Sequence, residues 1–96
     1  MGIYVELIKS DVIEPGFVYY NYQFSVLAET YKNKAGKLRN KFKLVEGTIK
    51  IDKRTGETHV IDLAEGDKGL YAQRADSALR KHWEKGEFPD KTCWAS

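Results

Sequence analysis

Two histidines and one cysteine are the side chains of this sequence best suited to metal binding or nucleophilic chemistry: His59, His82 and Cys93. A structural or catalytic metal needs three or four ligands at recognisable spacing, and these residues are scattered singly. Cys93 has no activating neighbour in the sequence, and His82 stands beside Trp83 on an apolar stripe. We therefore expect no metal site, a packed and hydrogen-bonded His82, and a buried, inert Cys93.

Motifs for nucleotide binding and for known catalytic mechanisms are missing from the sequence. It has no phosphate-binding loop, no dinucleotide fingerprint, no nucleophile elbow and no His-x-Glu arrangement. We therefore expect a protein that is not an enzyme, without catalytic residues or a cofactor. A small enzyme stays open as an alternative, because catalytic groups can converge from distant strands.

A basic segment at residues 32–43 is the sharpest electrostatic feature. It carries six positive residues and no acidic one, whereas the rest of the chain has 10 basic and 14 acidic residues, a net charge of −4. Such a segment can contact phosphates or an acidic protein surface, with Lys34, Lys37 and Arg39 as candidate contact residues. Alternatively, it is a solvated hairpin whose lysines discourage pairing with other strands. It lacks the interleaved aromatic residues of a single-strand binding platform.

The odd-numbered face of a long strand at 17–31 is the second candidate surface. It places Phe17, Tyr19, Leu27 and Tyr31 among polar residues. Tyrosine is favoured in protein interfaces and lysine is depleted there, so Phe17, Tyr19 and Tyr31 are candidate partner contacts. The alternative is that the C-terminal segment or a second copy of the chain covers this face.

Four strands are expected to position these residues. Alternation of apolar and polar side chains, interrupted by turn residues, predicts strands at about 3–8, 17–31, 41–52 and 57–63. The even positions of the long strand are apolar and should face the core. In the last of the four strands, Ile61 and Leu63 are expected to point inward.

The strand at 41–52 carries apolar residues of both parities. Phe42 and Leu44 are even, whereas Ile49 and Ile51 are odd. Because side chains alternate with a period of two, all four can face the core only if one extra residue is inserted. We expect that β-bulge at Val45–Gly47, where the glycine would accommodate it.

The apolar period lengthens after Gly66, which predicts a helix at about 68–85 with Asp67 as its N-cap. Leu79 should be buried and Arg80 exposed. An extended tail at 86–96 should dock on the body through its aromatic residues. The predicted fold is α+β: a single domain, 1–96, with a four-stranded antiparallel meander and one C-terminal amphipathic helix packed on the sheet. The stripe expected on the helix is Leu70, Tyr71, Ala75, Ala78, Leu79, His82 and Trp83.

Composition agrees with one folded domain. The 96 residues are 42% hydrophobic and 31% charged, with a formal net charge of +2, which argues against disorder. One cysteine cannot form an internal disulfide, so a reducing compartment fits. Neither a signal-peptide pattern nor an apolar run of ~20 residues is present. We expect a cytoplasmic, bacterial-type protein that does not enter a membrane.

The leading functional hypothesis is a small non-enzymatic protein-binding module, with a protein partner or a homodimer. A toxin-neutralising inhibitor of the immunity type is one form of it. Bacterial immunity proteins are generally small single domains without catalytic motifs, an analogy of type that involves no shared motif. The alternative is a nucleic-acid-associated module that uses the basic hairpin 32–43, and a small enzyme is the third possibility.

Overall fold

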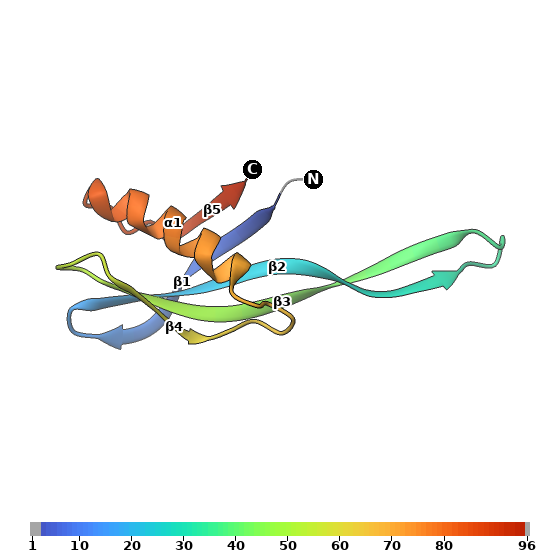
Figure 1. Cartoon of the computed structure of the whole chain (residues 1–96), viewed down its shortest axis with the longest axis horizontal. Helices are drawn as coiled ribbons and strands as arrows, with labels where there is room; N and C mark the ends of the chain where they lie inside the picture. The colour runs from blue at the N-terminus through green and yellow to red at the C-terminus, as the bar shows by residue number, and fades with distance from the viewer. Residues whose placement is uncertain (1–2, 96) are drawn as a thin grey trace.

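The computed structural model describes residues 3–95 and folds them into a five-stranded sheet with one helix. The elements are β1 (Tyr4–Glu14), β2 (Phe17–Lys32), β3 (Leu38–Asp52), β4 (Thr58–Asp62), α1 (Leu70–Glu84) and β5 (Lys91–Ala95). Every strand pair is antiparallel, the strand order is β4-β3-β2-β1-β5, and α1 packs on one face of the sheet (Figure 1). The predicted α+β class is confirmed, but the sheet has five strands, not four.

The fifth strand comes from the segment that we expected to be an extended tail. β5 pairs with β1, with Tyr4 opposite Ala95 and Ile8 opposite Lys91. Docking of the tail through Phe88 and Trp94 is confirmed, because both side chains pack against the core. The strand itself was missed because five residues show too little alternation to predict pairing. It forms because β1 offers an unpaired edge.

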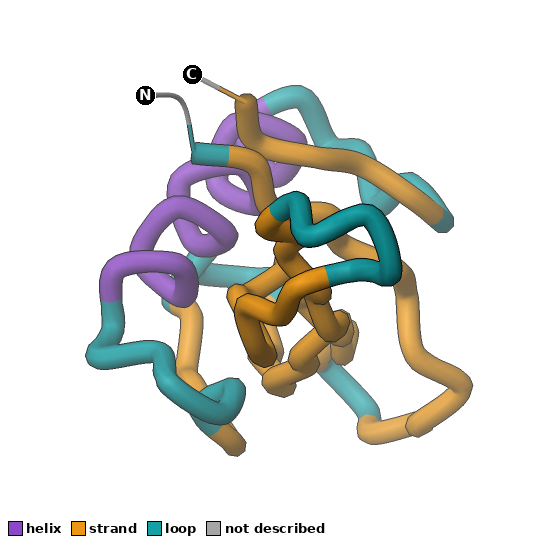
Figure 2. The backbone as a smooth tube through the Cα atoms, turned by 90° about the vertical axis from the view of Figure 1, so that its right-hand side faces the viewer, coloured by secondary structure: helices purple, strands orange, loops and turns teal. Residues whose placement is uncertain are grey.

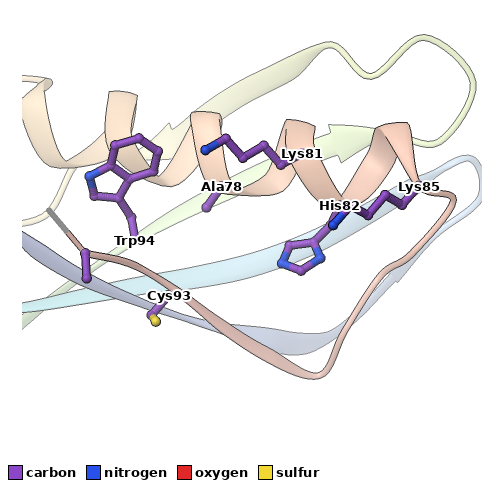
Figure 3. Close-up of a pocket in the computed structure, with 7 residues that line it drawn as sticks. Ala78, Lys81, His82, Lys85, Cys93 and Trp94 are labelled. Carbon is purple, nitrogen blue, oxygen red and sulfur yellow. The ribbon is translucent and has the colours of Figure 1, made fainter.

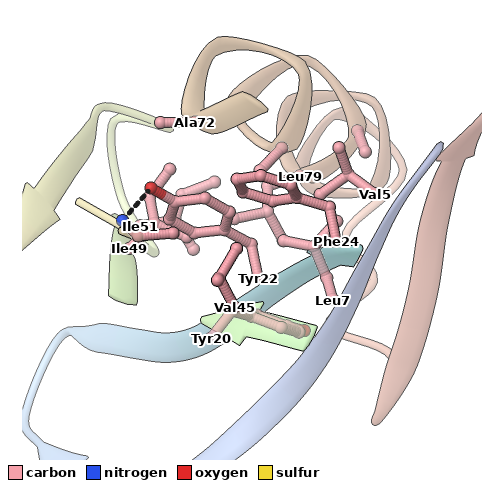
Figure 4. Close-up of a cluster of buried hydrophobic side chains, with 13 residues drawn as sticks. Val5, Leu7, Tyr20, Tyr22, Phe24, Val45, Ile49, Ile51, Ala72 and Leu79 are labelled. Atoms are coloured by element: carbon pink, nitrogen blue, oxygen red, sulfur yellow. Dashed lines mark hydrogen bonds between the residues drawn. The ribbon is translucent and has the colours of Figure 1, made fainter. Parts of the chain in front are cut away.

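The hydrophobic core fills the space between α1 and the helix-facing side of the sheet (Figure 4). Tyr20, Tyr22 and Phe24 of β2 are buried there, as the even-position pattern predicts. From α1, three alanines let the helix lie close to the strands, and Leu79 is buried beside them. The alanines are Ala72, Ala75 and Ala78.

A buried carboxylate connects the start of α1 to the sheet. Asp67 accepts hydrogen bonds from the backbone N–H groups of Gly69, Tyr71 and Ala72 at 2.8, 3.2 and 3.1 Å. Its side chain therefore caps the first turn, but the predicted N-cap position is wrong, because α1 begins at Leu70 rather than at 68 and its N-cap residue is Gly69. Gly69 has a left-handed backbone with φ of 106°, a conformation that favours glycine.

The expected bulge at Val45–Gly47 is wrong. Pairing of β2 with β3 is continuous from Phe17–Asp52 to Leu27–Phe42. The odd-numbered residues of β3 therefore share the core face, and Phe42 and Leu44 lie on the opposite face. The prediction was wrong because it assumed that all the apolar residues of this strand face the core, and these two do not.

The irregularity in this strand pair lies in β2, where Ala28 is inserted between Leu27 and Glu29. Gly47 has a different role, because the Tyr22 ring occupies the space that a Cβ at position 47 would fill. A glycine inside a strand often marks such a close approach rather than a bulge.

The inward orientation expected for Ile61 and Leu63 is also wrong. Both side chains are about half exposed. In β4 it is Thr58 and Val60 that pair with the core residues Ile51 and Ile49, and the ladder then shifts by one residue. The strand lies at the sheet edge, where even the core-side Val60 stays exposed.

Beyond Phe24 and Val45, β2 and β3 leave the body of the molecule as a two-stranded ribbon, which we call the arm (residues 25–44; Figure 1). Apart from the half-buried Val26 and Asn33, every residue of the arm is exposed. It makes the molecule elongated, with extents of 56 × 24 × 22 Å. The side-chain oxygen of Asn33 accepts hydrogen bonds from the N–H groups of Ala35 and Lys37 and holds the loop at the tip.

Candidate functional site

The sheet has one uncovered face, which we call the outer face. α1 lies on the other side of the sheet (Figure 2), and residues 3–95 place no further helix or strand over the outer one. Antiparallel sheets commonly pack one face and expose the other. Since directly paired residues share a face, the strand register identifies the charged residues here. On the body of the molecule five are acidic and two basic: Glu6, Glu14, Glu46, Asp52, Asp62, Lys50 and Lys91.

Phe17 and Tyr19, two of the predicted contact residues, lie at the body end of the outer face. The Lys50 ammonium lies 4.2 Å from the ring centroid of Phe17 and 5.6 Å from that of Tyr19. The Lys50 ammonium also donates a hydrogen bond to the Glu14 carboxylate at 3.0 Å, and the Tyr19 hydroxyl donates one to the same carboxylate at 3.1 Å. These hydrogen bonds lower the pKa of Glu14, and the bond to Glu14 raises the pKa of Lys50. Both aromatic side chains are half-buried and engaged by their own sheet.

The other four predicted residues lie at the far end of the arm. Tyr31 pairs with Arg39 beside the loop, and Lys34 and Lys37 lie in the loop itself. The structure therefore divides the six candidates between opposite ends of β2. They cannot form one compact site.

Between these two groups lies an apolar cluster that sequence reasoning missed. Leu27 is paired with Phe42, and Leu44 follows on the same face one pair closer to the body. Their side chains are 55%, 59% and 62% exposed. We call these three residues the apolar patch. Their parity was the available signal, but we assigned Phe42 and Leu44 to the core.

The arm concentrates positive charge. It contains six basic residues and one acidic residue, a net of +5, so the rest of the chain carries −3. Lys43 pairs with Glu65 at 3.1 Å, and Lys41 lies 3.9 Å from Glu29. Within residues 3–95, no acidic group pairs with the remaining four basic residues, which surround the tip: Lys32, Lys34, Lys37 and Arg39.

Two of the residues first considered for chemistry, His82 and Cys93, line a cavity of about 290 Å³ between α1 and β5 (Figure 3), whereas His59 lies in β4 at the opposite edge of the sheet. His82 is half-buried, with Nδ1 3.3 Å from the Glu87 carboxylate and Nε2 2.8 Å from the Thr92 hydroxyl. The predicted packed and hydrogen-bonded state of His82 is confirmed. Burial of Cys93 is wrong, because its edge strand turns this thiol outward. Among the described residues, no three His, Cys, Asp or Glu side chains group to hold a metal ion.

The fold and the surface define a class of protein: a small α+β domain with an open sheet face and a protruding, basic β-arm. No protein-family model matches the chain, and neither curated proteins nor solved structures show a match. In the part of the chain that the structure describes, no helix is long and apolar enough to cross a membrane.

Proposed function

We propose that this protein is a non-enzymatic protein-binding module that engages its partner through the arm and the adjoining outer face. The observation that supports this function is the apolar patch on a ribbon only two strands wide. A two-stranded hairpin is marginally stable by itself in water. Clustered apolar side chains that stay exposed on such a ribbon are typical of an interaction site.

The shape and charge of the arm support the same function. The arm extends from a compact body, so its tip can reach a recess or cover a site on another protein. Basic residues at the tip favour an acidic partner surface and speed its encounter. Arginine and tyrosine are enriched among energetically dominant interface residues, and Tyr31 and Arg39 lie together at this end. A toxin-neutralising inhibitor that acts by occlusion is one form of this function.

Photo-crosslinking tests the proposal. A photoreactive residue at position 42 should crosslink one defined protein in extracts of the source cells. The same residue at the exposed Gln73 of α1 should not. Equal yields from both positions, or no protein adduct from position 42, would contradict a binding role for the arm.

A nucleic-acid-associated module is the second candidate, supported by the four basic residues at the tip, which pair with no acidic group among residues 3–95. A two-stranded ribbon has the width to enter the major groove of DNA. If this function holds, affinity falls with salt with a log–log slope of about −0.9 per phosphate contacted on duplex DNA, and replacing Lys34, Lys37 and Arg39 by Gln flattens the slope.

We expect the wild type to bind DNA and RNA no better at ~150 mM salt than any mildly basic protein. The −3 charge of the body repels a long polyanion. Submicromolar, salt-sensitive binding would promote this second candidate over the first.

We also propose a bacterial-type cytoplasm as the site of action. Cys93 is exposed and free. A lone exposed thiol persists most readily where the compartment is reducing.

A further inference from the structure

We infer that the partner of the apolar patch is a second copy of this chain. Two copies would associate in antiparallel fashion about a two-fold axis through the patch, with each arm tip over the outer face of the other copy's body. This inference rests on the proposed protein-binding function and names its partner.

The first support is charge complementarity within the chain. The outer face of the body carries five acidic residues against two lysines, a net of −3. Lys34 and Lys37 occupy the loop at the tip, and Lys32 shares the face of the apolar patch through its pairing with Leu38. An antiparallel dimer places this basic tip against the acidic face twice, once in each direction.

The second support is the position of the patch. From Phe42 to Lys37, where the loop begins, is five residues, or roughly 17 Å of strand at ~3.3 Å per residue. In the opposite direction along β3, the outer-face acids Glu46 and Asp52 lie roughly 13 and 33 Å from Phe42 by the same measure. A two-fold axis at the patch therefore superimposes each tip on the part of the other body that carries these acids.

The competing arrangement is a parallel one, in which both arms point the same way. It would bury the same patch but place the +5 of one arm beside the +5 of the other. Like charges at short range oppose association. The antiparallel arrangement avoids this repulsion and keeps the patch at the centre, where interface residues are best shielded from water.

The size of the surface predicts a weak dimer. The two copies overlap from one tip to the other, over twice the distance from Phe42 to the loop, or roughly 33 Å of strand. A two-strand ribbon is about 10 Å wide at the strand spacing of ~4.8 Å. The overlapping face is thus on the order of 350 Å² per copy, below the roughly 800 Å² per partner of a standard interface. Association should therefore depend on concentration in the micromolar range.

Sedimentation equilibrium on the purified full chain, from about 5 to about 500 µM, tests the inference. We expect a monomer of 11.0 kDa at the low end and twice that mass at the high end. Phe42→Ser and Leu44→Ser should each raise the dissociation constant at least about tenfold, since the patch lies at the centre of the interface. Leu70→Ser is the matched control, because Leu70 is an exposed leucine on the helix layer, and it should leave the constant unchanged.

Charge reversal tests the orientation. Lys32→Glu, Lys34→Glu and Lys37→Glu together should weaken the dimer at low salt, and the difference from wild type should shrink as salt screens the charges. Circular dichroism melts of each variant establish that the fold is intact, which the exposure of all these side chains favours.

Three results would overturn the inference: a monomer throughout the concentration range, a dimer insensitive to both patch substitutions, or a dimer strengthened by the charge reversal. If the pure protein is monomeric but position 42 crosslinks a different protein in extracts, the dimer fails and the proposed binding function stands. If position 42 captures no protein at all, both fail.

Discussion

Tyr22 connects three parts of the molecule through one side chain. Its ring packs in the core and lies against Gly47, and its hydroxyl donates to Asp67 at 2.9 Å and accepts the Ala64 N–H at 3.0 Å. Because Asp67 also caps α1, the hydroxyl links β2 to the start of the helix. A buried polar group of this kind stabilises the fold only when all of its partners are present.

Removal of the Tyr22 hydroxyl should therefore destabilise the protein. Tyr22→Phe leaves the buried Ala64 N–H without a partner and takes one donor from Asp67, at an expected cost of about 1–3 kcal/mol. Tyr31→Phe, at an exposed position of the arm, should change the free energy of unfolding by less than about 0.5 kcal/mol. Urea denaturation measures the free energy of unfolding of both variants. Equal losses of stability would contradict a stabilising role for the hydrogen bonds of the Tyr22 hydroxyl.

Gly47→Ala should also destabilise the protein, because the added Cβ meets the Tyr22 ring. Overpacking of this kind costs about 1–3 kcal/mol. In a Tyr22→Leu background the obstructing ring is gone, so the same glycine substitution should cost much less. A double-mutant cycle by denaturant melts measures this coupling. If the two substitutions change the free energy of unfolding independently, the Tyr22 ring is not the reason why position 47 requires a glycine.

The core tyrosines predict a loss of stability at alkaline pH. Burial raises the pKa of Tyr20 and Tyr22 to about 12 from an ordinary value of 10.0. The folded state favours the neutral phenol, so this contribution is complete below pH 10 and is lost as the pH rises toward 12. Urea melts at increasing pH should show the decline, and Tyr20→Phe should reduce it. A free energy of unfolding that stays constant up to pH 12 would contradict the assignment.

At the scale of elements, α1 is held by a narrow apolar stripe. Its buried residues are three alanines and Leu79, so this leucine is the largest of the buried side chains on the helix. Tyr71 adds a ring stacked on Phe24 at a centroid distance of 3.6 Å. On the solvent side, Arg80 pairs with Asp76 one turn away at 2.9 Å.

Leu79→Ala should cost about 2–5 kcal/mol, because a large buried side chain is lost and the alanines around it cannot fill the cavity. Arg80→Ala, one position further on, should cost no more than about 0.5 kcal/mol, since it removes only an exposed ion pair on one helix. Guanidinium melts compare the two. Similar losses would mean that the helix is rotated from the orientation described above.

At the scale of the whole molecule, the body and the arm differ in what holds them. The body has a continuous core between helix and sheet, whereas the arm contributes none of the buried apolar residues. The register of β2 against β3 is set in the body by the buried pairs Tyr20–Ile49 and Phe24–Val45. The arm is therefore an extension of a sheet that is already specified.

Removal of the arm should leave the body folded. Val26 and Lys43 are direct partners, so replacing residues 27–42 by Asn-Gly gives a two-residue hairpin of favoured geometry. We expect unchanged helical circular dichroism and a free energy of unfolding within about 1 kcal/mol of wild type, because no buried side chain is removed. A variant that fails to fold would show that the arm supports the core.

Local patterns of the sequence predict much of the fold. Alternation identified the inward face of β2, from Tyr20 to Phe24, because that strand is buried on one side only. The change of period after Gly66 and the capping carboxylate of Asp67 located α1 to within two residues. The concentration of lysines at 32–43 marked the tip of the arm as the most positive part of the chain.

The remaining features depend on tertiary contacts that no local pattern records. Phe42 and Leu44 lie on the face of β3 opposite to the helix, and no helix or strand within residues 3–95 packs on that face. β5 exists because the edge of β1 is free, and Gly47 is explained by a ring 25 positions away in the sequence. The sequence by itself determined the first four strands, the helix and the inward face of β2, because these follow from the periods of strand and helix. Only the tertiary structure decided which apolar residues are covered and which form an exposed patch, because burial depends on the elements packed alongside and not on the period of the strand.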